Sequence, residues 1–219
     1  MVCTNSGAEF SPCKTHRYSL WRIWDDSKPK VMFIGLNPST ANDSTDDNTI
    51  RRVKKMAFEW GFGGVYMANL FTYISTDPAK LDPYGNGISK YIGYIQQLTL
   101  YCDTIIFAWG NFPQAIERGK IIADLYDGYA LELNKNGSPK HPLYVKSNIR
   151  PVNYKDPTGA NGAAIDVCYR NSDGTVDVHY SRTENTWECK KLLREVRKVI
   201  SQQGSSTQYF IRRNGIKID

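Results

Sequence analysis

Residues 31–52 read VMFIGLNPSTANDSTDDNTIRR, and this stretch predicts a buried strand, a tight polar loop and a helix. The apolar run at 31–34 is typical of a strand that is buried on both faces. Gly35 permits backbone angles that are closed to other residues, and Pro38 fixes its own φ angle. Open α/β sheets bind ligands in loops at the carboxyl ends of parallel strands, so this loop is the first candidate for a functional site.

The helix after this loop has recognisable start and stop signals. Ser44 or Thr45 can cap its N-terminus, and Asp46 and Asp47 then lie in the first turn, where acidic residues interact favourably with the helix dipole. Apolar residues recur at helical spacing through the next turns, and Gly61 follows as a C-terminal cap. These signals predict a helix between the acidic pair and the glycine.

The alternation of strand and helix continues along the chain. Further strand-like runs lie at 65–71, 104–108 and 129–133, and helical patterns lie at 89–102 and 114–126. This order predicts an α/β three-layer sandwich with a mostly parallel central sheet and helices on both faces. We assign residues 1–150 to this domain.

The character of the sequence changes near residue 151. A loop rich in Gly, Asn and Pro is followed by two alternating runs, AIDVCYR and TVDVHYS, that flank the turn sequence NSDG and predict a hairpin. A basic amphipathic helix is predicted at 184–200, and TQYFIRR at 207–213 is typical of a final strand. Residues 151–219 are therefore expected to form a small β-β-α-β extension.

The composition is that of an ordinary globular protein with a basic surface. The chain of 219 residues carries a net charge of +6, which suits a polyanionic partner such as DNA or a nucleotide. Its five cysteines include no CxxC pair, so we expect no metal site built from close cysteine pairs, and the hydrolysis considered below requires no cofactor. No membrane-length apolar run and no apolar core of a signal peptide are present, so we expect no membrane association and a cytoplasmic location.

Polar residues follow the predicted strands at one edge of the sheet. Asn37 lies in the first loop, Asn69 ends the second strand, and His141 lies in the loop after the fourth strand. An asparagine amide can pair with the edge of a base through one donor and one acceptor. A histidine can stabilise negative charge on a departing group. We expect these three side chains to converge.

The motifs around these residues resemble those of the uracil-DNA glycosylase superfamily. GLNPS at 35–39 is similar to the superfamily's water-positioning loop in its asparagine form, MANL at 67–70 to the strand that reads the flipped base, and HPLY at 141–144 to the histidine loop. The resemblance implies a glycosylase-like fold and hydrolysis of an N-glycosidic bond in DNA after base flipping. Two features depart from the pattern: Asn37 cannot act as a general base, and no serine follows His141 and Pro142.

A longer set of motifs is similar to a bacterial and phage family known as domain of unknown function 1643. FSPC, RYxLWRxW, GLNPSTA, DDxTIRR, NLF, TDP, AWG and HPLY all stand between Phe10 and Tyr144. The family's distribution is consistent with a role in phage–host conflict or DNA modification.

These resemblances and the basic helix lead to specific expectations for the site. Water positioning and stabilisation of the leaving base are expected from Asn37, Asp46, Asp47 and His141. Substrate binding is expected from Gly35, Pro38, Ser39, Asn69, Tyr73 and Trp109, with Tyr73 or Trp109 stacking on the base. Contacts with the DNA backbone are expected from Arg51, Arg52, Lys190, Lys191, Arg194 and Arg197.

Structural explanations and other functions stand beside this hypothesis. The aspartates at 46 and 47 can serve only the helix terminus and pair with Arg51 and Arg52, Asn37 can serve only its own turn, and the basic helix can be a solvated surface. The alternative functions are a module that binds a modified base or nucleotide without cutting it and an enzyme that acts on free nucleotides.

Overall fold

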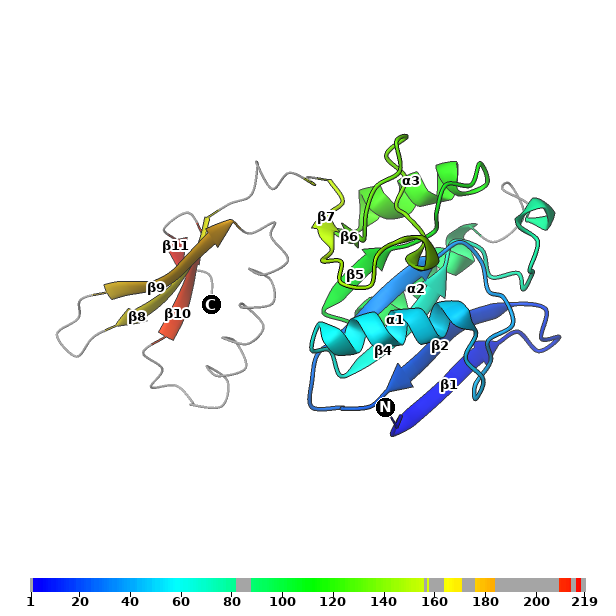
Figure 1. The fold of residues 1–219 in the computed structure, drawn as a ribbon, viewed down its shortest axis with the longest axis horizontal. Coiled ribbons are helices and arrows are strands. Elements are labelled where there is room, and N and C mark those ends of the chain that lie inside the picture. Colours follow the sequence, from blue (N-terminus) through cyan, green and yellow to red (C-terminus); the bar gives the residue numbers. More distant parts are fainter. Residues whose placement is uncertain are drawn as a thin grey trace. The chain divides into compact units, whose positions relative to one another are not determined.

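The computed structural model describes residues 2–81, 88–155 and 157, together with the strand backbones at 164–170, 176–183, 209–213 and 216–217. The chain divides into two compact units, Met1–Tyr154 and Lys155–Asp219. The first unit holds the motifs described above and is drawn with its helices and strands in Figure 1.

A seven-stranded sheet forms the centre of the first unit. Its strands are β1 (Asn5–Phe10), β2 (Arg17–Ile23), β3 (Lys30–Gly35), β4 (Gly64–Asn69), β5 (Thr104–Phe107), β6 (Tyr129–Ala130) and β7 (Val152–Asn153). They lie in the order β1-β2-β4-β3-β5-β6-β7. The neighbours β4, β3, β5 and β6 are parallel, whereas β1, β2 and β7 pair antiparallel. The sheet is therefore mixed rather than mostly parallel, and the predicted α/β class is confirmed.

The two N-terminal strands were not predicted, because β2 does not show the apolar alternation of an ordinary half-buried strand. Its sequence RYSLWRI buries Arg17 and Arg22, at 3% and 2% exposure, together with Leu20 and Ile23. Buried arginines are rare without a partner, so charge at these positions usually indicates a solvent-facing side. Because of these buried arginines, the sequence pattern does not predict the strand.

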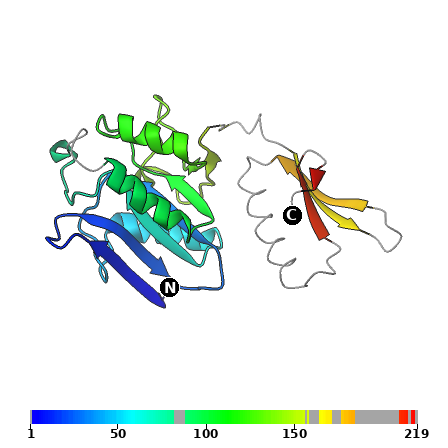
Figure 2. The ribbon, with the colours of Figure 1, turned by 180° about the vertical axis from the view of Figure 1, so that it is seen from behind.

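Helices cover both faces of the sheet, as Figures 1 and 2 show from opposite sides. The helix α1 (Asn48–Glu59) lies on one face, and α2 (Ile88–Thr99) and α3 (Ala115–Leu125) lie on the other. Alternate residues of β3 divide between them: Phe33 stacks on Trp60 at the end of α1, while Met32 and Ile34 join a core cluster that includes Ile122 of α3. Burial on both faces explains why residues 31–34 are uniformly apolar.

The N-terminus of α1 differs from the prediction. Asp47, rather than Ser44 or Thr45, is the capping residue, and its carboxylate accepts a hydrogen bond of 2.8 Å from the backbone N–H of Ile50. Thr45 instead belongs to a turn in which its N–H donates to the side chain of Asn42. The helix ends as predicted, because Gly61 follows it with a φ of 85°, a conformation that glycine adopts readily.

The second unit contains an antiparallel sheet in the order β11-β10-β8-β9. Its strands are β8 (Ala164–Arg170), β9 (Val176–Thr183), β10 (Tyr209–Arg213) and β11 (Ile216–Lys217). The predicted hairpin is confirmed by the pairing of β8 with β9, and the predicted final strand is present as β10. The predicted helix at 184–200, with Lys190, Lys191, Arg194 and Arg197, lies outside the described residues.

None of the helices in the described ranges combines the length and the apolar composition that crossing a bilayer requires.

Candidate functional site

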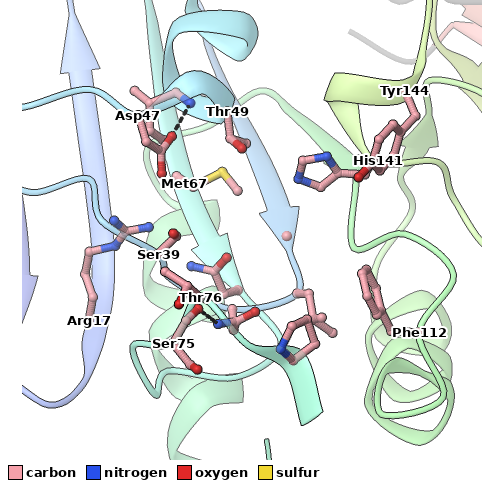
Figure 3. A pocket seen from close by; sticks show the side chains of 16 residues that line it. Arg17, Ser39, Asp47, Thr49, Met67, Ser75, Thr76, Phe112, His141 and Tyr144 are labelled. Carbon is pink, nitrogen blue, oxygen red and sulfur yellow. Dashed lines mark hydrogen bonds between the residues drawn. The ribbon is translucent and has the colours of Figure 1, made fainter. Parts of the chain in front are cut away.

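A cavity of about 190 Å³ lies at the carboxyl ends of β3 and β4 (Figure 3). Loops that are far apart in the sequence contribute its walls: the loop after β3, the start of α1, residues 75–78 and the segment around residue 141. Its polar lining consists of Arg17, Asn37, Ser39, Asp47, Thr49, Asn69, Ser75, Thr76 and His141. The three side chains expected to converge, Asn37, Asn69 and His141, thus line one cavity.

Asn69, at the end of β4, presents a buried amide to this cavity. The residue is only 4% exposed, and neither its Nδ2 nor its Oδ1 has a hydrogen-bond partner among the described residues. A Cβ atom added to Gly35 on the adjacent strand would come within 2.9 Å of the Asn69 Oδ1, so the glycine leaves room for this amide. Buried amides in folded proteins are nearly always paired, so one unpaired donor and one unpaired acceptor indicate a place for a ligand.

Asp47 brings a carboxylate to the same cavity. One of its oxygens caps α1, which fixes the side chain at the N-terminus of the helix. The helix dipole and the unpaired N–H groups of the first turn favour a negative charge at this position. Asp47 therefore combines a structural role in the cap with a charged group at the wall of the cavity.

His141 begins the short helix η2 (Pro142–Tyr144) and is held in one orientation. Its Nδ1 accepts a hydrogen bond of 3.3 Å from the backbone N–H of Leu143, which assigns the proton of the neutral ring to Nε2. Burial lowers the pKa of His141 from its ordinary value, and the negative charge of Asp47 partly opposes this shift. Near neutral pH the ring is thus uncharged and has an Nε2–H donor.

Asn37 fixes the loop after β3. Its Nδ2 donates to the backbone oxygens of Pro38 at 3.0 Å and Ser75 at 2.7 Å, and the N–H of Ser75 donates to the same Pro38 oxygen at 3.0 Å. Asn37 therefore joins two loops of the cavity wall through its amide group. Gly35 and Ser39 also line the cavity, whereas Pro38, which was expected to bind substrate, is not among its lining residues.

The aromatic residues at the cavity are not the two that were expected to stack on a base. Trp109 is 2% exposed, because it packs in the core against Phe107 and Tyr154. Tyr73 is 43% exposed and contacts the ring of His16 outside the cavity. Phe112 and Tyr144 line the cavity instead, on the same side as His141 in Figure 3. Tyr144 is the last residue of the HPLY motif, and Phe112 lies two residues after AWG, so these two motifs were the available signal.

Tyr73 lines a second, shallower hollow of about 530 Å³. Lys80 is also on its wall, at the end of the short helix η1 (Pro78–Lys80). The cavity and this hollow share the lining residues Ser39, Ser75 and Thr76, so the two adjoin at these three polar residues.

Arg17 is the main residue of the cavity that sequence reasoning missed. Its Nη1 donates to the backbone oxygen of Ala41 at 2.6 Å, while its Nε is buried without a partner in the part of the chain that the structure describes. Burial lowers the pKa of Arg17 to about 10, with Asp47 opposing the shift and Arg22 adding to it, so the guanidinium stays charged at neutral pH. The arginine that opens the RYxLWRxW motif was the signal for it.

Asp46 does not line the cavity. Its carboxylate forms ion pairs with Arg22 at 2.8 Å and Lys54 at 2.7 Å. Burial alone would raise the pKa of Asp46, but the hydrogen bonds from Lys54 and Arg22 lower it overall. Asp46 therefore holds the loop before α1 against β2.

Arg51 and Arg52 also make contacts within the protein. Arg51 donates to the backbone oxygen of Asp46 and to the side chain of Asn48. Arg52 donates to the oxygens of Pro142 at 3.3 Å and Val145 at 2.6 Å, and so attaches the His141 segment to α1. Neither arginine pairs with Asp46 or Asp47 through the side-chain carboxylate.

Within residues that the structure describes, no group of three or more His, Cys, Asp or Glu side chains is placed to hold a metal ion.

Residues of the cavity lie in the part of the chain that matches a known sequence family. Residues 17–143 match a family described as a protein of unknown function (DUF1643), a range that includes Arg17, Asp47, Asn69 and His141. Comparisons with curated proteins and with solved structures gave no match. The family match covers more than half of the chain, which therefore belongs to the DUF1643 family.

Proposed function

We propose that the chain is a hydrolase that cleaves the N-glycosidic bond of a non-standard or modified base in DNA. The observation that carries this proposal is the buried, unpaired amide of Asn69 in a cavity that also contains Asp47 and His141. An amide with one free donor and one free acceptor matches the hydrogen-bonding edge of a base. A base stacked in a duplex cannot reach such a site, so the target nucleotide would be flipped into the cavity.

The dimensions of the cavity suit one base. At about 190 Å³ it is smaller than the roughly 300–1,000 Å³ of typical sites for drug-sized ligands. Phe112 and Tyr144 on its wall offer aromatic surface beside the polar groups, and aromatic surface favours a planar ring.

The reaction uses water and two side chains. Asp47 accepts a proton from water as the water oxygen bonds to the sugar C1′, and the bond from C1′ to the base nitrogen breaks with its electron pair remaining on the base. The Nε2–H of His141 donates a hydrogen bond to the departing base and stabilises its negative charge. The base anion then takes up a proton from the solvent, and Asp47 releases the proton it accepted to the solvent. Asn37 keeps the loop that orients the water in place through its bonds to Pro38 and Ser75.

A DNA substrate, rather than a free nucleotide, is supported by the adjoining hollow. Tyr73 and Lys80 lie there, next to the cavity, and offer a stacking surface and a positive charge to a neighbouring nucleotide. The similarity of the GLNPS, MANL and HPLY motifs to those of uracil-DNA glycosylases supports the same substrate class and a glycosylase-like sandwich around the parallel strands β4, β3, β5 and β6.

A module that binds a modified base without cleaving it is the second candidate. One observation favours it: a carboxylate oxygen of Asp47 is already engaged in the helix cap, so a structural role accounts for this aspartate without catalysis.

A panel of DNAs tests the proposal and names the base. Duplex and single-stranded DNAs carrying uracil, damaged bases or phage-type modified bases are incubated with the protein, and free bases are identified by mass spectrometry. We expect release of one class of base and loss of this release in Asn69→Ala. Binding of one modified DNA without release would instead favour the binding module.

A further inference from the structure

Two buried arginines on the same strand differ in how their charges are balanced. Arg17 and Arg22 both lie on β2 and are 3% and 2% exposed. The Nε of Arg22 donates to the carboxylate of Asp46 at 2.8 Å, and its Nη2 donates to the backbone oxygen of Asn42. Arg22 is therefore neutralised within the protein, as a buried charge normally is.

Among the described residues Arg17 lacks such a partner. Its guanidinium forms no ion pair with a carboxylate there, and its contact with Ala41 engages Nη1 alone. Its Nε–H has no acceptor within the same part of the chain. A buried charge without a counterion or a full set of hydrogen bonds destabilises the folded protein, so an unpaired arginine at a cavity indicates an anion that binds to it.

The position of Arg17 is suited to such an anion. Figure 3 shows its guanidinium on the opposite side of the cavity from His141 and Phe112, near Ser39. Ser39, Ser75 and Thr76 line both the cavity and the adjoining hollow, and the hydroxyl group of Ser75 is already hydrogen-bonded to the backbone of Asp77. Hydroxyl groups and an arginine are common ligands of phosphate oxygens.

We propose that Arg17 binds a phosphate group of the nucleotide whose base occupies the cavity, so that the substrate is a phosphate-bearing nucleotide unit and not a nucleoside or free base. This inference rests on the proposed function, because that function supplies the nucleotide. The phosphate belongs either to the DNA backbone, as a diester, or to a free nucleotide, as a monoester.

Nuclear magnetic resonance of the full-length protein can test this inference without a known substrate. The Nε–H signal of Arg17 is assigned by its absence in Arg17→Lys and followed during titration with dimethyl phosphate or with inorganic phosphate, against sodium chloride at equal ionic strength. The Nε–H signal of Arg22 is the internal control, because this N–H already donates a hydrogen bond to the carboxylate of Asp46. We expect a saturable shift of the Arg17 signal with at least one probe and a several-fold smaller shift for Arg22. The probe with the lower Kd distinguishes the diester source from the monoester source.

An Arg17 signal that moves no more than the Arg22 signal with either probe would overturn the inference. Thermal unfolding of Arg17→Gln provides a second measurement: we expect the ligand-free Tm to be unchanged or raised, and the rise in Tm that phosphate gives the wild type to disappear. A lower ligand-free Tm with the phosphate effect retained would show that Arg17 is structural. Base release without phosphate binding would support the proposed function and contradict the inference about Arg17. Phosphate binding without base release would support the inference about Arg17 and contradict the proposed function.

Discussion

Asn69 shows how a single side chain indicates a candidate binding site, because its buried amide has no hydrogen-bond partner among the described residues. An unpaired buried polar group costs about 1–3 kcal/mol, and a folded protein retains it where a ligand restores the hydrogen bonds. Its place at the end of a predicted strand made it a candidate in the sequence. Its unpaired state appears only in the structure, because it depends on Gly35 and on the packing of the adjacent strand.

We expect Asn69→Ala to separate stability from recognition. Removing the unpaired amide leaves the free energy of unfolding unchanged or slightly raised, whereas affinity for the target base falls roughly 10- to 100-fold because a bidentate base contact contributes about 1–3 kcal/mol. Urea unfolding and a DNA-binding titration with the modified base measure the two effects. A loss of stability without a loss of affinity would show that the amide serves the fold.

Asp47 has two roles that different substitutions distinguish. Asn and Asp cap helices about equally well, so Asp47→Asn should keep the stability of the wild type while Asp47→Ala loses about 1 kcal/mol. Both variants should lose base release by at least 10²-fold, since neither has a carboxylate to accept the proton of water. Unfolding curves and release rates of the two variants check this pair of outcomes; full release by Asp47→Asn would remove the carboxylate from the mechanism.

His141 should give the protein a pH-dependent stability. Because burial lowers its pKa in the folded state, the unfolded chain binds the proton more strongly. Its contribution to stability is complete above the ordinary histidine pKa of about 6.5 and is lost as the pH falls from there through the lowered value. Unfolding of wild type and His141→Gln between pH 8 and pH 4.5 should show a smaller decrease in the variant; parallel curves would contradict it.

At the scale of elements, the loop between β3 and α1 is held by charge. Asp46 joins it to Arg22 of β2 and to Lys54 of α1. Asp46→Asn leaves Arg22 buried without its counterion, and we expect a loss of about 3 kcal/mol in the free energy of unfolding. Arg51→Gln, which alters an exposed arginine of α1, is the matched control and should change stability by less than about 0.5 kcal/mol. Equal effects of the two substitutions would contradict this role for Asp46.

The central strands and helices were predictable because their apolar residues recur with a clear period. The run at 31–34 and the helical spacing before Gly61 correspond to β3 and α1. The pair β1–β2 was not predictable in the same way, because Arg17 and Arg22 occupy buried positions that are usually apolar. The helix cap was misplaced by two residues or more, since several consecutive residues in NDSTDD can cap a helix and only the fold selects Asp47.

For the whole molecule, the extent of the first unit can be tested by truncation. The strand β7 adds to the sheet beside β6, and Tyr154 packs its ring against Phe107 and Trp109. We expect a fragment of residues 1–155 to unfold cooperatively, and a fragment of residues 1–150 to lose about 3 kcal/mol because the aromatic contact and the edge strand are gone. Thermal unfolding of both fragments measures this difference. Equal stability would place the boundary at residue 150, as the sequence suggested.

The site was predictable in part because parallel strands gather their carboxyl ends at one edge of a sheet. That rule brought Asn37, Asn69 and His141 together, and they line the same cavity. It could not find Arg17, which comes from an antiparallel strand, nor exclude Trp109, whose burial depends on contacts with Tyr154 far along the chain.

The most direct test of the central claim is a single-turnover release experiment on the DNA that the panel identifies. Wild type and Asp47→Asn are mixed in excess with this DNA, the free base is quantified by mass spectrometry, and the abasic strand by alkaline cleavage. The account predicts that the wild type releases base and abasic strand in equal amounts, while Asp47→Asn binds the DNA equally well and releases neither at a measurable rate. Equal release by both proteins, or tight binding without release by the wild type, would contradict it.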